Sequence, residues 1–77
     1  MGISLSDAAA IDVRVDDAAL HVRLRDGREM TAPLTWFPRL HAAAPGDRDE
    51  WSLIGDGEGI HWPRIDEDIS VAGLLRA

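Results

Sequence analysis

The alternation that decides the fold runs over residues 11–32, IDVRVDDAALHVRLRDGREMTA. In residues 11–16, and again in 20–25, every second residue is apolar and the residues between them are charged or polar. This period of two is typical of antiparallel strands that bury one face and leave the other in water. The sequence therefore predicts that the first half of the chain is a β-meander.

The register of the first hairpin follows from keeping the apolar residues on one face. A turn at Asp17-Ala18 achieves this, whereas a slip by one residue would move every side chain to the opposite face. The turn predicts these cross-strand pairs: Val15 with Leu20, Val13 with Val22, Ile11 with Leu24 and, on the outer face, Asp12 with Arg23.

The next turn, RDGRE, allows two registers. A two-residue turn would place Leu24 opposite Glu29, which sets an apolar residue against an acid. A three-residue loop over residues 25–27 instead pairs Val22 with Met30. It also puts the glycine of the loop in the left-handed position that such loops need. We therefore predict the three-residue loop and a third strand after it.

The pattern changes after Pro33. Residues 35–44, TWFPRLHAAA, predict a helix with Thr35 as its N-cap, and residues 45–50, PGDRDE, predict a second short helical turn. Residues 51–62, WSLIGDGEGIHW, predict two strands around a glycine-rich hairpin loop.

The chain ends in a short helix, VAGLL, for which Ser70 is the predicted N-cap. The predicted order is β-β-β-α-β-β-α, an α+β fold with a small antiparallel sheet. We expect a single compact domain over residues 1–77, in which residues 1–8 are a candidate for disorder.

Composition and charge limit the partners. The chain has 77 residues, no cysteine and a net charge of −6, of which residues 1–46 carry −1 and residues 47–77 carry −5. Such a surface repels phosphate backbones, so we expect no direct nucleic-acid binding and a small basic protein as partner.

A small core without disulfides also gains from burying more apolar surface in an oligomer. The predicted edge strands at 11–16 and 51–54 carry no proline or lysine that would block pairing, so we expect a two-fold homodimer. The first residues, MGISLSDAAA, lack the basic start and apolar run of a signal peptide. No apolar run approaches the ~20 residues of a membrane helix. We therefore expect a cytoplasmic protein with no membrane contact.

The richest stretch for chemistry is GIHWPRIDEDIS, residues 59–70. Its histidine and its three acids, Asp66, Glu67 and Asp68, could bind a metal or act in acid–base catalysis. The spacing matches neither an EF-hand nor an HExxH zinc site, and GDGEG lacks the GK[ST] ending of a phosphate loop. We expect no catalytic residue, metal or cofactor, and interpret the acids as a solvated acidic lip before the last helix.

The three tryptophans, Trp36, Trp51 and Trp62, are expected to be mainly core residues. Part of their surface could serve as a binding patch, because tryptophan and arginine dominate interface hot spots. Within residues 59–62 the alternation places Ile60 and Trp62 inward and His61 outward.

The pattern WSLIG-x-GEGIHWP-x-x-DEDIS-x-x-GLL, together with LTWFPRLHAA before it, closely resembles the bacterial domain-of-unknown-function family 2442. The resemblance covers most of the chain and implies a small α+β fold with a compact antiparallel sheet. It also implies a frequent genetic neighbour, another small domain, in an arrangement like a toxin–antitoxin pair in which this family is the antitoxin-like or accessory member. It carries over no catalytic residue.

The hypothesis that follows is a non-enzymatic protein-binding module that holds a small basic partner encoded next to it. Two alternatives stay open: a small-ligand or metal sensor, and an enzyme that uses His61 with residues 66–68. The candidate partner-binding residues are His61, Trp62, Arg64, Asp66, Glu67 and Asp68.

Overall fold

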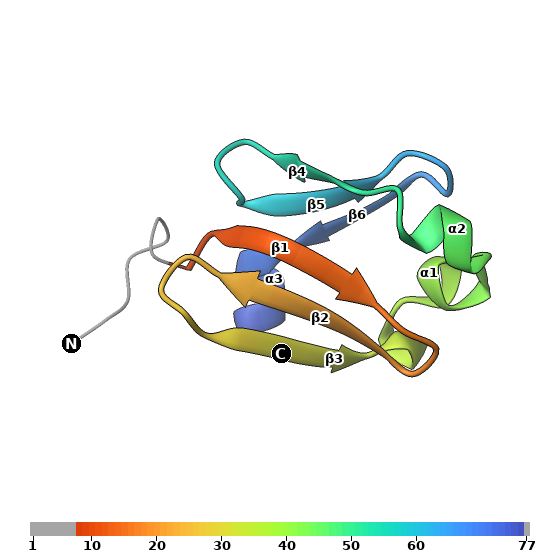
Figure 1. The fold of residues 1–77 in the computed structure, drawn as a ribbon, viewed down its shortest axis with the longest axis horizontal. Coiled ribbons are helices and arrows are strands. Elements are labelled where there is room, and N and C mark those ends of the chain that lie inside the picture. The colour runs from red at the N-terminus through yellow and green to blue at the C-terminus, as the bar shows by residue number, and fades with distance from the viewer. Residues whose placement is uncertain (1–7, 77) are drawn as a thin grey trace.

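The predicted meander is the first sheet of the structure. A computed structural model describes residues 8–76, and in it β1 (Ala10–Val15), β2 (Ala19–Leu24) and β3 (Glu29–Pro33) form an antiparallel sheet in sequential order (Figure 1). The inward residues of these strands are apolar and, apart from Ile11 and Pro33, the exposed ones are charged or polar, as the period of two requires.

The predicted register is confirmed at most of its pairs. The structure has Val15 opposite Leu20, Val13 opposite Val22, Asp12 opposite Arg23 and Val22 opposite Met30. The pair of Ile11 with Leu24 is wrong. An irregularity between Ala10 and Asp12 shifts the register, so that Ala10 takes the place opposite Leu24 and Ile11 is 49% exposed. A bulge of this kind adds a residue to one strand and turns its side chain out of the pattern.

The three-residue loop between β2 and β3 is also confirmed. The N–H of Leu24 donates to the carbonyl of Arg28 across it, and Gly27 has φ +94°, a value that side chains rarely tolerate. The loop therefore fixes the parity by which β3 presents Met30 and Ala32 to the core.

The connection between the two sheets is more broken than predicted. It contains a 3₁₀ turn, η1 (Leu34–Trp36), and two short helices, α1 (Pro38–Ala42) and α2 (Pro45–Arg48). The predicted cap at Thr35 is wrong: α1 begins after Phe37 with Pro38 at its first position, where a missing N–H costs nothing.

The second sheet holds one strand more than predicted. Strands β4 (Ser52–Ile54), β5 (Gly59–Trp62) and β6 (Glu67–Ser70) are antiparallel and follow one another in the sheet. The hairpin of β4 and β5 around the glycine loop is confirmed. The loop-like acidic lip at 66–68 is wrong, because Glu67 and Asp68 pair with β5 as part of β6.

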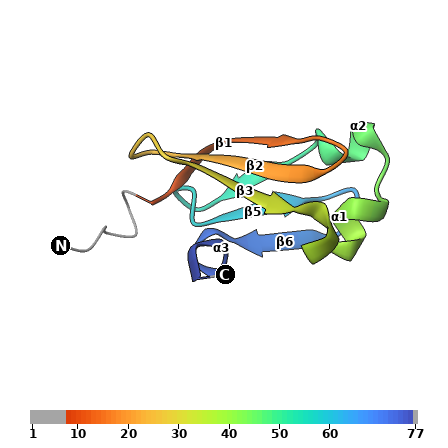
Figure 2. The ribbon, with the colours of Figure 1, turned by 90° about the horizontal axis from the view of Figure 1, so that it is seen from below.

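The chain ends in α3 (Val71–Arg76), and Ser70 caps it as predicted, since its Oγ accepts the N–H of Gly73 at 3.1 Å. Figures 1 and 2 show the two sheets facing each other, with α3 beside β6 and with α1 and α2 at one end. The α+β class is confirmed, with two three-stranded sheets in place of one. The fully buried large side chains come from both sheets and from the connection between them: Leu20, Val22, Leu24, Leu34, Leu40, Ile60 and Trp62.

A buried arginine ties the connection to both sheets. Arg48 is 8% exposed, and its guanidinium donates to the carbonyls of Leu40 (3.1 Å) and His41 (2.7 Å) and to the carboxylate of Asp17 in the β1–β2 turn (3.2 Å). Its own carbonyl accepts the indole N–H of Trp62 at 3.0 Å. A buried charge is tolerated only with such partners.

The glycine loop makes the other junction between the sheets. The N–H of Ala10 donates to the carbonyl of Gly57 at 2.8 Å, and Gly57 has φ +94°. A Cβ at Gly57 would collide with the backbone of Ala10. Only glycine fits where the two backbones approach so closely.

Residues 1–7 lie outside the described residues, and so does most of the segment predicted as a candidate for disorder. Ala8, its last residue, is buried. Among the helices within residues 8–76, none is long and apolar enough to cross a membrane.

Replacing Gly57 tests the junction of the sheets. Gly57→Ala combines a disfavoured backbone conformation with a clash against Ala10, so we expect a loss of stability of at least about 2 kcal/mol. Thermal unfolding should show a midpoint lower by roughly 8–16 °C in a domain of this size. Gly46→Ala is the matched control, because a Cβ there meets open space. Equal melting temperatures for the two variants would contradict this junction.

The titration of Asp16 tests the β1–β2 turn. The hydrogen bond from His21, followed by those from the N–H groups of Ala18 and Ala19, lowers the pKa of Asp16 from 3.8 to about 2. Because the folded pKa lies below the unfolded one, this contribution is present above pH 3.8 and is lost as the pH falls through about 2. A carboxyl ¹³C titration should give a midpoint near 2 for Asp16, and His21→Ala should raise it. An ordinary midpoint in the parent protein would refute the contact.

Candidate partner-binding site

The predicted site residues lie on a β-hairpin and therefore divide between its two faces. Trp62 ends β5, residues 63–66 turn the chain, and Glu67 begins β6. Asp66 has φ +52° in that turn. The predicted set does not form one surface, because alternate residues of a strand point in opposite directions.

Trp62 is not available to a partner. It is 0% exposed and its indole N–H is held by the carbonyl of Arg48. The prediction that Trp62 binds a partner is wrong, whereas its inward orientation, shared with Ile60, is confirmed. Of the tryptophans expected to be mainly core residues, Trp62 is fully buried, Trp51 is half-buried and packs against the core, and Trp36 is 54% exposed.

His61 and Asp68 meet on the outer face of the second sheet. They are paired residues of β5 and β6, and His61 Nδ1–H donates to Asp68 Oδ1 at 2.5 Å. Ser52 of β4 lies opposite His61 on its other side, so a serine, a histidine and an aspartate form one row across the sheet. Within residues 8–76, however, no hydrogen bond joins Ser52 to His61, and neither residue lines a cavity described below.

The remaining predicted residues have separate surroundings. Arg64 Nε donates to Glu50 Oε2 at 2.7 Å on the surface, which raises the pKa of the guanidinium above its usual value. Arg39 donates to the carbonyl of Asp66 at 2.9 Å. Glu67 is half-buried and its Oε1 accepts the N–H of Asp68 at 3.2 Å. Among these acids, Asp68 is the one that both contacts His61 and belongs to β6, the edge strand of the second sheet.

A groove of about 240 Å³ runs beside that edge, and it was not predicted. It is mainly apolar. Asp68 lines it together with these residues of β6, α3 and the segment before α1: Trp36, Phe37, Ile69, Ser70, Gly73 and Leu74. The signal in the sequence was the Trp36-Phe37 pair itself, because neighbouring aromatics at a break between two short helices cannot both point inward. Their rings meet edge to face, with centroids 6.5 Å apart, and Trp36 stays exposed.

The outer edge of β6 carries backbone groups that β5 does not use. The N–H of Val71 donates to the carbonyl of Glu58, which makes residues 69 and 67 the next ones hydrogen-bonded to β5. Of the intervening residues, Asp68 then directs both its N–H and its C=O away from β5. Ser70 directs its N–H away as well, but its C=O, as that of the N-cap of α3, accepts the first hydrogen bond of the helix. The close contact of His61 with Asp68 agrees with this, because side chains approach most closely in the pairs without mutual backbone bonds.

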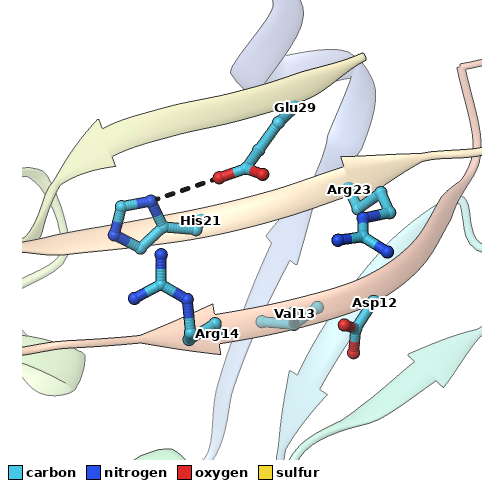
Figure 3. A pocket seen from close by; sticks show the side chains of 6 residues that line it. All are labelled: Asp12, Val13, Arg14, His21, Arg23 and Glu29. Atoms are coloured by element: carbon cyan, nitrogen blue, oxygen red, sulfur yellow. Dashed lines mark ion pairs between the residues drawn. The ribbon is translucent and has the colours of Figure 1, made fainter. Parts of the chain in front are cut away.

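A second cavity, of about 190 Å³, lies on the outer face of the first sheet. Figure 3 shows Arg14, His21 and Arg23 interleaved with Asp12 and Glu29, and His21 Nδ1 lies 3.6 Å from Glu29 Oε1. Cations and acids alternate across the strands, so neither sign dominates the surface. Within residues 8–76, no group of three or more histidines and acids is placed to hold a metal ion.

Comparison with known proteins assigns the chain to a family. Among solved structures, the fold is similar to a crystal structure of a protein of unknown function from Rhodospirillum rubrum ATCC 11170, with 28% sequence identity and a TM-score of 0.77. The match covers 88% of this chain and 84% of that one. A search of curated proteins finds no match. The model of the family of proteins of unknown function DUF2442 matches residues 10–77, from the first strand to the C-terminus, and the chain therefore belongs to that family.

Proposed function

We propose that the chain is a non-enzymatic protein-binding module of the cytoplasm. Its partner is a small basic protein encoded next to it, towards which it acts as an antitoxin-like or accessory member. The observation that carries the proposal is the exposed Trp36 over an apolar groove that Asp68 also lines. An aromatic anchor beside an acid is the combination that interface hot spots favour for a cationic, partly apolar partner.

Charge supports a basic partner. The groove lies next to the acidic run at 66–68, and five of its seven lining residues belong to the half of the chain that carries −5. Opposite charge across an interface raises the association rate and selects against acidic competitors. The contribution is screened by salt, because these acids lie at the surface.

The alternatives have less support. The groove is below the roughly 300 Å³ at which small-molecule sites usually begin, so it suits one or two side chains better than a sensed ligand. The row of Ser52, His61 and Asp68 is the arrangement closest to a catalytic site. Ser52 and His61 line neither of the two cavities found within residues 8–76, whereas acyl transfer needs an enclosed site with oxyanion-binding donors.

The proposal includes a two-fold dimer that leaves the groove free. Both β1 and β4 are edge strands, and each carries a large exposed apolar side chain, Ile11 and Ile54. An open edge with exposed isoleucine favours pairing with a second copy.

Sedimentation equilibrium tests the dimer. The expected mass is twice the 8.4 kDa of the chain. Ile54→Thr should shift the equilibrium towards monomer, because it removes apolar surface from the β4 edge. Trp36→Ala is the matched control: it removes a larger exposed apolar side chain, and the dimer should survive it. A monomer mass for the parent at micromolar concentration would rule the dimer out.

Binding to the product of the adjacent gene tests the function. Asp66→Asn combined with Asp68→Asn should weaken the complex by roughly 0.4–2 kcal/mol, about two- to thirtyfold, since each exposed ion pair contributes about 0.2–1 kcal/mol. Raising the salt from about 50 to about 500 mM should weaken it as well.

The control for that experiment removes the same charge elsewhere. Asp12→Asn with Asp56→Asn removes two acids that belong neither to the run at 66–68 nor to the groove lining and should leave the affinity unchanged. Calorimetric titration of the two double variants gives the comparison. Absence of any complex with the neighbouring protein would overturn the proposed function. Equal affinities of the two double variants would show that the acidic run takes no part in binding.

A further inference from the structure

The geometry points to a specific mode of binding: the partner adds an extended segment to β6 as a fourth strand of the second sheet. This inference rests on the proposed function and states how the partner is held. The added segment alternates basic and apolar side chains, the basic ones beside Asp68 and the apolar ones in the groove under Trp36.

The backbone of β6 supplies the first reason. The N–H and C=O of Asp68 and the N–H of Ser70 point away from β5, as the ladder requires, while the C=O of Ser70 belongs to the first turn of α3. Two residues before Asp68, in the turn that precedes β6, the carbonyl of Asp66 accepts a hydrogen bond from Arg39. The N–H of Asp68 meets only the neighbouring Glu67 carboxylate, an exposed contact that a new backbone partner can replace. The segment from Asp68 to Ser70 is thus a short edge that another strand can pair with.

The side chains around the edge supply the second reason. Asp68 and Ser70 project to the outer face of the sheet, where His61 lies, whereas Ile69 projects inward. A strand paired with β6 repeats this alternation, because side chains at neighbouring positions point to opposite faces. Its outward residues therefore lie beside the Asp68 carboxylate. Its inward residues lie over Ile69 and Leu74, against the exposed ring of Trp36.

Charge decides the occupant. A two-fold pairing of β6 with β6 of a second copy would set the acidic run at 66–68 against itself, and like charges directly across a sheet are destabilising. A segment with arginine or lysine at alternate positions instead places a cation beside Asp68 on the outer face and leaves the apolar residues between them to face Trp36. The occupant is therefore a basic segment of another protein.

The experiment uses the full chain and a capped synthetic peptide that alternates arginine with valine as the probe. In a ¹⁵N NMR titration the amides of Asp68 and Ser70 and the Trp36 indole should shift together. The amide of Leu53, which by the same alternation faces the opposite edge of the sheet, should not. A peptide that alternates glutamate with valine is the charge control and should not bind. Shifts at the β4 edge, or none at all at millimolar peptide, would overturn the inference.

N-methylation of the peptide separates strand addition from side-chain binding alone. Methyl groups on the residues whose N–H faces β6 should abolish binding, whereas methyl groups on the alternate residues should leave it nearly unchanged. Equal effects of the two methylation patterns would show that the groove is used without strand pairing and would refute this mode.

Two variants test the groove without touching the core. Trp36→Ala should weaken the peptide roughly tenfold or more, as truncating an aromatic anchor does. Gly73→Leu should block the groove and still fold, because a Cβ at Gly73 makes only ordinary contacts with Ser70, 3.5 Å to its Cβ. Gly46→Leu is its matched control in open space. Full affinity in Gly73→Leu would contradict a role for the groove.

These experiments distinguish a failure of the strand-addition mode from a failure of the proposed function. If the neighbouring protein binds and Gly73→Leu has no effect on it, the module function stands and strand addition fails. If the peptide binds as described but the neighbouring protein does not, the mode stands and the proposed partner is wrong.

Discussion

The contact of Arg48 with Trp62 is the constraint on which the rest of the structure depends. The arginine is buried at the end of α2, where its guanidinium donates hydrogen bonds to two carbonyls of α1 and to the carboxylate of Asp17. Its own carbonyl accepts the indole N–H of Trp62. One residue thereby joins the connection between the sheets, the first hairpin and the last buried position of β5. A guanidinium with all these acceptors is stable in a small core, where an unpaired charge would cost several kcal/mol.

Fixing β5 in this way determines where the free surface lies. With Trp62 and Ile60 inward, His61 must face outward, and the pairing of β6 with β5 then sets Asp68 beside His61. The other edge of β6 stays open next to the groove of Trp36. The candidate binding site is thus a consequence of how the core packs. It combines an aromatic side chain that the interior does not accommodate, an acid, and the unpaired edge of a short strand.

Much of the fold could be predicted from the sequence because it depends on local parity. The pairs of Val13 with Val22 and of Val22 with Met30 follow from the period of two and from a glycine that needs positive φ. The bulge at Ile11 was missed, because the alternation runs on through it, and the backbone bonds of Ala10 with Gly57 and of Ala9 with Arg25 that accompany it are tertiary contacts.

The site was predictable only in part. The acids at 66–68 resemble a solvated loop, and nothing local shows that β6 pairs through residues 67–70. An edge strand with one face in water accepts acids that a central strand would not. The burial of Arg48 and the exposure of Trp36 are tertiary outcomes. They depend on which of several aromatic and charged residues the small core can accommodate, and a single sequence does not rank these.

The central claim is that β6 is a true open edge in the free protein, and amide hydrogen exchange tests it most directly. The N–H groups of Glu67 and Ile69 face β5 and that of Val71 donates to the carbonyl of Glu58, so all three should exchange slowly. Those of Asp68 and Ser70, which face away from β5, should exchange orders of magnitude faster, near the rate of an exposed loop. Slow exchange at all five positions in the free chain would show that the edge is already covered and would contradict the account.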